Sequence, residues 1–420
     1  MRNPSLELLR IFAMFLIVCH HFAVHGAIHA GRLSELLQFS FIKVLWVQFL
    51  ASGGKIGVNL FVLITGYFLI KSTPKISSLV RLYLTTVFYT IPIYFLFVFL
   101  HKTHFSLETF LENLFPITTG RYWFITCYAV LFLFAPFLGL GLRCIFGVSS
   151  STSNKLNINN FSSSKINVEI NKNKKIFNPL IFFIGLLKCK WIFSYPENFI
   201  LNKGFIRGLF LNITLFILFS FVPTFILKGK WPSFYVNDLI WFITLFCQAS
   251  FISFFGLRLP QKPILFFVLC LTFLFSSLIY LDLSLMMGIK TNVNWYFLGG
   301  QNNVVIVFLS ILIFLFFKDI NINYNRIIIK LINFFAPATL GVYLIHDNNY
   351  VRGYLWSELF NTTKHFVSGS FFLWSIYAII AVFLICSVID RILALLERPL
   401  FKFISNKLSG LDNKMRELFT

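Results

Sequence analysis

The stretch that decides the fold lies near the start of the chain: Leu8-Leu-Arg-Ile-Phe-Ala-Met-Phe-Leu-Ile-Val-Cys-His-His-Phe22. It is apolar enough to form most of a membrane-spanning helix, yet it contains Arg10 and His21. Their spacing of eleven residues is about three helical turns, so both side chains project from one face, about 16 Å apart along the axis. Ionisable groups inside an apolar span are costly, and by default they mark function. We therefore predict a membrane helix that carries part of a functional site.

The rest of the chain has the composition of a membrane protein. Of its 420 residues, 58% are hydrophobic, 12% are charged and 57 are phenylalanine. The apolar runs are continuous rather than alternating and about 20 residues long, which favours helices over a β-barrel. We predict an all-α polytopic transmembrane helix bundle of about ten spans. The expected spans are 8–26, 56–71, 82–100, 122–142, 205–227, 238–255, 263–281, 302–318, 329–346 and 371–390.

The chain is expected to divide into five segments. Residues 1–143 contain the first four spans, and residues 201–393 contain the other six. Residues 144–175 are rich in Asn, Ser and Lys and predict a disordered cytoplasmic insert. Residues 176–200 are apolar but include Lys188 and Lys190, which favours an interfacial or re-entrant helix. Residues 394–420 are expected to form a basic cytoplasmic tail.

The net charge of +21 comes from loops between the spans. With the N-terminus inside, 26 of the 36 Lys and Arg residues face the cytoplasm, as the positive-inside rule requires. This distribution excludes nucleic acid as the reason for the charge and predicts two cytoplasmic termini. The partner that it indicates is the lipid bilayer.

The first span offers a candidate catalytic group. Glu7 precedes Arg10 by three residues and can orient its guanidinium, and His21 can act as a general base near neutral pH. One alternative is that these groups only hydrogen-bond neighbouring helices. Another is a zinc site, because His21, His25 and His29 have i, i+4, i+8 spacing. No acidic residue accompanies the three histidines along the sequence, so we expect no metal.

Four further segments carry weaker signals. Asn59, Thr65 and Gly66 in the second span permit close packing and interhelical hydrogen bonds, which packing alone explains. The cations that follow, Lys71, Lys75 and Arg81, could bind the phosphates of a nucleotide-containing cofactor or lipid headgroups.

The fourth span opens with Arg121-Tyr-Trp-Phe-Ile125, and the ninth ends in His346-Asp347-Asn348, with Arg352 beyond. Polar and aromatic residues are common at both kinds of span end.

Together these segments resemble the membrane-bound acyltransferase family 3, the bacterial O-acetyltransferases. The resemblance rests on Glu7, Arg10 and His21, on the pattern from Gly57 to Tyr67 with Thr65 in place of Ser, on Tyr122-Trp-Phe124, and on Gly341-Val-Tyr-Leu-Ile-His346. It covers nearly the whole chain except 144–200.

The resemblance implies transfer of an acyl group from cytoplasmic acyl-CoA, most often acetyl-CoA, to a carbohydrate hydroxyl at or across a bacterial cell membrane. The implied catalytic residues are His21, Arg10 and Glu7. Those implied to bind the acyl-CoA are Arg10, Lys71, Lys75 and Arg81, and those implied to bind the acceptor are Asn59, Tyr67, Trp123, His346, Asp347 and Arg352. Whether His21 deprotonates the hydroxyl or carries the acyl group stays open. The alternative is a transporter or flippase for glycan or lipid, but the halves of the chain show no convincing repeat.

Overall fold

The computed structural model describes residues 3–27, 33–72, 75–147, 202–227, 237–288, 300–320 and 325–419. In these ranges the chain is helical and has no extended strand, which confirms the expected all-α bundle. Three segments, labelled η, are π-helical. The elements are α1 (Pro4–His21), η1 (Phe22–Ala27), α2 (Leu33–Phe39), α3 (Phe41–Leu69), α4 (Ile76–Phe99), α5 (Leu107–Leu114), α6 (Trp123–Phe146), α8 (Lys203–Phe216), η3 (Ile217–Ile226), α9 (Asp238–Phe255), α10 (Pro263–Met286), α12 (Val304–Asp319), α13 (Arg326–His346), α14 (Asn349–Gly353), η4 (Tyr354–Leu359), α15 (Thr362–Val367), α16 (Phe371–Lys407) and α17 (Ser409–Phe419).

Nine helices in these ranges are long and apolar enough to cross a membrane, and they correspond to nine of the ten expected spans. The tenth, expected at 302–318, is α12. Its 16 residues extend about 24 Å, which is shorter than a hydrocarbon layer of about 30 Å. The expected helix at 176–200 and all but the first four residues of the insert at 144–175 lie outside the described residues.

Two helix boundaries differ from the sequence-based expectation by more than ten residues. Helix α3 begins at Phe41, fifteen residues before the expected start, because Gly53-Gly54-Lys55 lowers the local hydropathy without ending the helix. Helix α16 continues to Lys407 instead of ending near residue 390, because the strong helix formers from Arg391 onward prolong it. The expected basic tail is thus helical.

Glycines bring the two central helices together. A Cβ atom at Gly54 would lie 2.2 Å from the Cβ of His20, and one at Gly57 would lie 2.5 Å from the carbonyl oxygen of Ala13. No larger residue fits either position without moving a helix. Small residues allow such close approach between helices in a membrane, where lipid is as apolar as the side chains. The contact between α1 and α3 therefore fixes the helix that carries the histidines.

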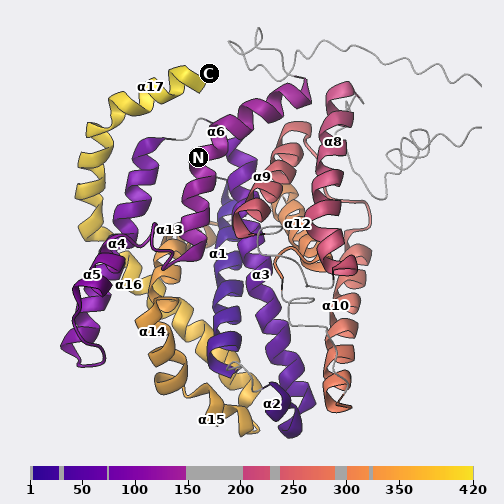
Figure 1. Ribbon diagram of the computed structural model, residues 1–420, viewed down its shortest axis with the longest axis vertical. Helices are drawn as coiled ribbons and strands as arrows, with labels where there is room; N and C mark the ends of the chain where they lie inside the picture. Colours follow the sequence, from indigo (N-terminus) through magenta and orange to yellow (C-terminus); the bar gives the residue numbers. More distant parts are fainter. Residues whose placement is uncertain are drawn as a thin grey trace, which may run out of the picture.

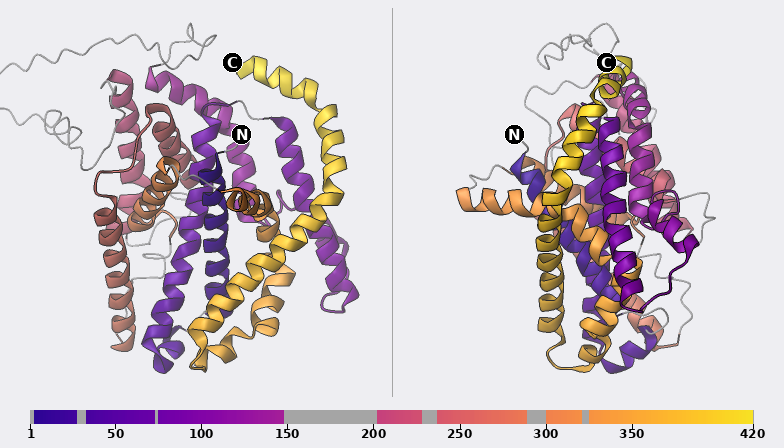
Figure 2. Two further views of the ribbon diagram at one scale, coloured as in Figure 1. Left: turned by 180° about the vertical axis from the view of Figure 1, so that it is seen from behind. Right: turned by 90° about the vertical axis from the view of Figure 1, so that its left-hand side faces the viewer.

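The remaining helices surround this pair (Figures 1 and 2). Helix α1 contacts α12, α13 and α16 as well as α3, whereas α10 lies at the edge and is mostly exposed. Figure 1 shows both chain ends at the same end of the bundle, with α2 and α15 at the other end. Helix α17 packs on the start of α4, where the Asp412 carboxylate accepts hydrogen bonds from the backbone N–H and hydroxyl of Ser77 at 3.1 and 2.5 Å.

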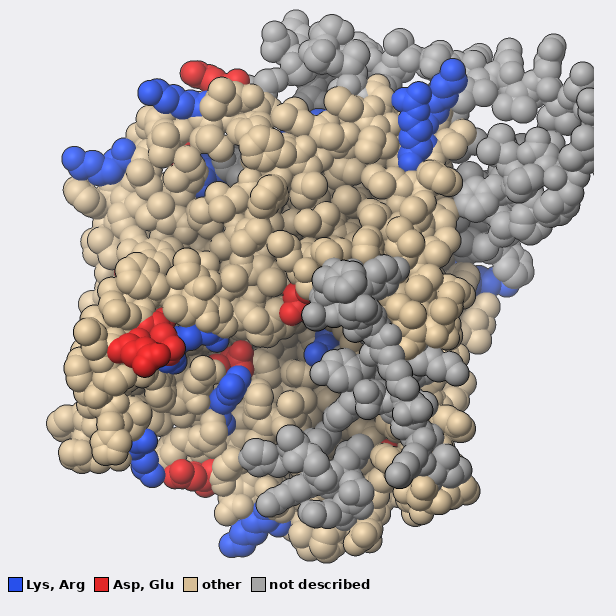
Figure 3. Space-filling view, in the orientation of Figure 1, with Lys and Arg blue, Asp and Glu red and all other residues tan. Residues whose placement is uncertain are grey.

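The described surface is mostly uncharged, as Figure 3 shows for one face. Phenylalanine contributes much of it, with Phe99, Phe137 and Phe210 each more than half exposed. In water such a surface would aggregate, whereas lipid covers it at no cost. The arrangement fits a protein of the bilayer.

We expect both termini to be cytoplasmic. The reason is the excess of Lys and Arg on the side that carries them. Reporter fusions at Thr420 and near Ser163 should both report the cytoplasm, and a control fusion at His101, in the turn after α4, should report the opposite side. An external fusion at Thr420 together with an internal one at Ser163 would contradict this topology.

Candidate active site

The site begins where the first helix changes its winding. Helix α1 ends at His21, and the chain continues as the π-helical segment η1 through Ala27. Such segments often mark functional sites, because the wider turn redirects side chains. The rings of His21 and His25 are 5.3 Å apart between centroids, so both lie on one side of this turn.

A hydrogen-bonded pair of histidines lies at the centre of the site. Nδ1 of His346 is 2.5 Å from the carbonyl oxygen of Val342, which can only accept, so this nitrogen carries its proton. In the neutral ring Nε2 of His346 is then an acceptor, and Nδ1 of His21 donates to it over 2.8 Å. We call this chain of hydrogen bonds, from His21 through His346 to the Val342 carbonyl, the histidine relay. It leaves the lone pair of His21 on Nε2. That is the tautomer a general base needs.

A buried carboxylate faces this nitrogen. Oδ1 of Asp347 lies 3.6 Å from Nε2 of His21, 3.9 Å from Nε2 of His25 and 3.6 Å from Nη1 of Arg352. Burial raises the pKa of Asp347 to about 7, and the charge of Arg352 opposes this rise. When ionised, the carboxylate can stabilise an imidazolium formed at His21.

A cavity of about 610 Å³ connects the two groups that the sequence singled out. Arg10 and His21 both line it, together with Trp123 and Tyr343. Their spacing on α1 means that the cavity extends along about three turns of helix. The cavity is large enough for an acyl chain and part of the coenzyme A to which the chain would be attached.

Arg10 is held by the residue that the sequence indicated. Its Nη1 donates to Oε1 and Oε2 of Glu7 at 3.0 and 3.3 Å, and its side chain is 31% exposed. Glu7 is nearly buried and does not line the cavity. Glu7 is therefore positioned to orient the guanidinium of Arg10.

The other expected phosphate-binding cations are placed apart. Arg81 lines a second cavity, of about 500 Å³, which shares Leu82, Tyr128 and Leu340 with the first. Nζ of Lys71 lies 5.5 Å from the centroid of the Tyr67 ring. Neither Lys71 nor the exposed Lys75 lines either cavity. Only Arg81 of these three thus adjoins the space that reaches Arg10.

Two of the expected acceptor-binding residues are involved in helix packing. The amide of Asn59 is fully buried: its nitrogen donates to the Gln301 carbonyl and the Ser310 hydroxyl, and its oxygen accepts from the Trp241 indole N–H at 3.0 Å. The ring of Tyr67 packs on Phe314. Neither residue lines the cavities described above. This placement agrees with the packing alternative for the second span.

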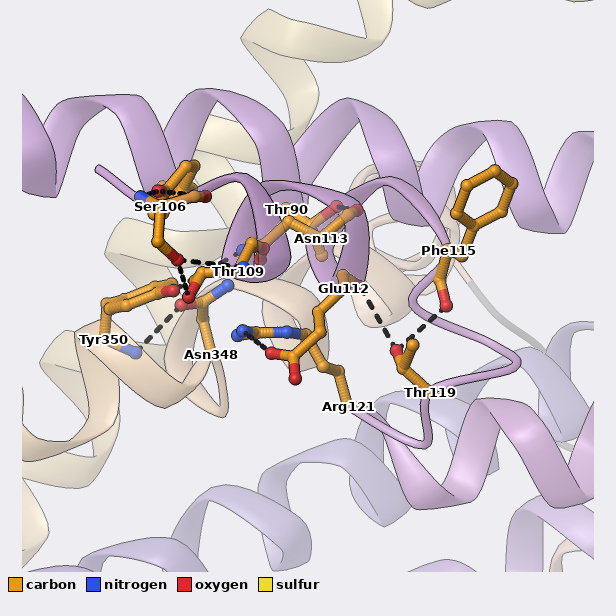
Figure 4. A network of polar contacts seen from close by, with 11 residues as sticks. Thr90, Ser106, Thr109, Glu112, Asn113, Phe115, Thr119, Arg121, Asn348 and Tyr350 are labelled. Atoms are coloured by element: carbon orange, nitrogen blue, oxygen red, sulfur yellow. Dashed lines mark hydrogen bonds and ion pairs between the residues drawn. The ribbon is translucent and has the colours of Figure 1, made fainter. Parts of the chain in front are cut away.

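The outer end of the site is supported by a polar network (Figure 4). The Asn348 carboxamide oxygen accepts from the Tyr350 backbone N–H at 3.0 Å, and its nitrogen donates to the Tyr122 hydroxyl at 2.9 Å. Tyr122 in turn donates to the carbonyl oxygen of Leu344 at 2.7 Å. Burial raises the pKa of Tyr122, so it stays a neutral donor.

The same network reaches helix α5 and the turn before α6. Arg121 and Glu112 form an ion pair at 2.6 Å, and the Asn113 amide approaches the Tyr350 hydroxyl at 3.4 Å (Figure 4). These contacts hold the chain on either side of Asp347. The segments lie more than two hundred residues apart in sequence, so their contact had no signal in the sequence.

Sequence reasoning missed several polar residues of the cavity wall. Lys55, Asp238 and Gln301 all line the main cavity. The Gln301 amide donates to the Asp238 carboxylate at 2.5 Å, and the charges of Lys55 and Asp238 attract each other. Lys55 could have been found, because a charged residue inside an apolar run is the signal that identified Arg10.

Comparison with known proteins agrees with this geometry. The chain has no match among curated proteins or solved structures. A family model described as an acyltransferase domain matches residues 3–391, which include α1, η1, the cavity and both histidines of the relay. This protein, an integral membrane acyltransferase, therefore belongs to the acyltransferase 3 family.

Proposed function

We propose that the protein transfers an acyl group, in the first instance acetyl, from cytoplasmic acyl-CoA to a hydroxyl of a cell-surface or lipid-linked carbohydrate at a bacterial cell membrane. The observation that carries this proposal is the single cavity lined by both Arg10 and His21. One end of this cavity holds a phosphate-binding group, and the other end holds a base. Donor and acceptor can thus meet inside the bundle.

The donor is assigned to the end with the chain termini. A guanidinium binds phosphate through two parallel hydrogen bonds, and Glu7 holds that of Arg10 at the cavity wall. Arg81 lies in the adjoining cavity and adds positive charge for a phosphorylated carrier. The thioester would extend from there along α1 towards His21.

The reaction uses the lone pair of His21. The acceptor hydroxyl donates its proton to Nε2 while its oxygen attacks the thioester carbonyl. The carbon–sulfur bond then breaks, and the thiolate of CoA takes the proton back. Asp347 stabilises the imidazolium between these steps. An acyl-histidine route would use the same nitrogen, as nucleophile instead of base, and neither route requires a metal ion.

The acceptor is assigned to the side of Asp347 and Arg352. A carbohydrate hydroxyl suits this region because the polar residues around Nε2 of His21 offer both donors and acceptors. Membership of an acyltransferase family supports this proposal over a glycan or lipid transporter.

The deciding experiment compares surface glycans from cells with and without the protein. Loss of the protein should remove an alkali-labile acyl ester from a glycan, and the wild-type gene should restore it. An unchanged ester content in every surface and lipid-linked glycan would contradict the carbohydrate acceptor.

A separate prediction concerns the donor. We expect Arg10→Lys to raise the acyl-CoA concentration needed for half-maximal rate by about tenfold, because lysine keeps the charge but lacks the planar fork. The measurement is the initial rate against acyl-CoA concentration in detergent-solubilised protein. Arg326→Lys, an exposed change at the start of α13, serves as the matched control. If both variants behave as wild type, Arg10 does not bind the donor.

A further inference from the structure

Three potential metal ligands meet beside the histidine relay. His21, His25 and Asp347 each place one ligand atom within 4.8 Å of those of the other two. The two distances to the carboxylate oxygen are 3.6 and 3.9 Å. In a tetrahedral zinc site with bonds of about 2.0–2.1 Å, neighbouring ligand atoms are about 3.4 Å apart. Small side-chain movements would therefore bring the three atoms around one ion.

The surroundings of His21 are those of a metal ligand. A ligating histidine usually donates its other ring N–H to an acceptor that fixes the ring and its tautomer. Here Nδ1 of His21 donates to Nε2 of His346, and His346 donates to the backbone of Val342. The lone pair of His21 is thereby fixed on the nitrogen that faces Asp347.

The carboxylate supplies a second, independent sign of a ligand. Oδ1 of Asp347 is buried and receives no close hydrogen bond from the described residues, although the Tyr343 hydroxyl and the Arg352 guanidinium lie near the carboxylate. A buried acceptor without a partner costs free energy, and a cation at this position would remove the cost. The three histidines of the sequence pattern lacked an acidic ligand, and the fold brings one to His21 and His25 from the end of α13.

The ligand set favours one class of ion. Two imidazoles and one carboxylate suit zinc and its neighbours, whereas magnesium and calcium prefer oxygen ligands. The charge of Arg352, whose Nη1 is 3.6 Å from the same carboxylate oxygen, opposes a cation. Its side chain is 37% exposed and can move towards solvent. These opposing effects predict an ion that exchanges rather than one that is held permanently.

We propose that a divalent transition-metal ion of the zinc class binds at His21, His25 and Asp347, and that the bound ion inhibits acyl transfer. The ion coordinates the lone pair on Nε2 of His21. Without the ion, this lone pair takes the proton of the acceptor hydroxyl or receives the acyl group. The inhibitory effect rests on the proposed function, whereas the binding itself does not.

Binding is tested on full-length protein in detergent by equilibrium dialysis against Zn²⁺, with Mg²⁺ as the comparison ion. One zinc ion per chain is expected, and His25→Ala or Asp347→Asn should each weaken its binding at least tenfold. His104→Ala, which removes an exposed histidine from the loop after α4, is the matched control and should bind as wild type. Absence of stoichiometric zinc, or equal affinity in all four proteins, would overturn the site.

Inhibition is tested by adding Zn²⁺ to the wild-type acyl-transfer assay and then removing it with a chelator. The rate should fall as the site fills and recover with the chelator, and His25→Ala should need at least tenfold more zinc for the same fractional loss. Full activity with the site occupied would overturn the inhibitory role. Zinc bound by a protein without acyl transfer would uphold the site and instead count against the proposed function.

Discussion

Replacing His21 with alanine should reduce acyl transfer by about 10²–10⁴-fold while the protein still accumulates in the membrane. The variant loses the nitrogen that accepts a proton beside Asp347, and the internal relay then ends at His346. The measurement is the transfer rate at saturating acyl-CoA, normalised to the amount of protein in purified membranes.

Two further variants separate chemistry from packing. In His21→Asn the side-chain amide can still donate towards His346 but has no basic nitrogen, so its rate should be as low as that of the alanine variant. His20→Ala should lose less than about tenfold, because Nδ1 of His20 bonds to the backbone of Ala51, outside the relay. Substantial activity in His21→Asn would remove His21 from the proton-transfer step and from any covalent step.

The fold followed from the sequence because hydropathy and helix length carry nearly all the information that a bilayer requires. The error at the start of α3 also comes from relying on hydropathy. Gly53, Gly54 and Lys55 look like the end of a span when hydropathy is summed, but a helix in a bundle continues through them where a neighbour fits closely. That neighbour is α1, and the sequence does not reveal which helix packs there.

The sequence indicated the candidate site only within single helices. The spacing predicted that Arg10 and His21 share one face of α1, and both residues line the cavity. The partner of His21 could not be predicted, because His346 lies 325 residues further along the chain. His346 and Asp347 looked like an ordinary polar end of a span. Only the contact between α1 and α13 places them beside His21.

The contact between the histidines leads to the second large effect. We expect His346→Ala to reduce the transfer rate at saturating substrates by on the order of 10²-fold, because the Nδ1 proton of His21 loses its acceptor and the ring its fixed tautomer. His346 is a positioning residue, since it acts through His21. The concentration of acyl-CoA needed for half-maximal rate should therefore stay near that of wild type.

A conservative variant distinguishes this role from a purely structural one. In His346→Gln the side-chain oxygen can accept the proton of His21, so part of the lost rate should return. Ile332→Val, a buried change on the same helix, controls for loosened packing and should retain most of the activity. If glutamine restores nothing, or if the alanine variant weakens acyl-CoA binding as much as it slows turnover, His346 supports the bundle rather than the base. The relay from Val342 through His346 to His21 would then have no part in the reaction.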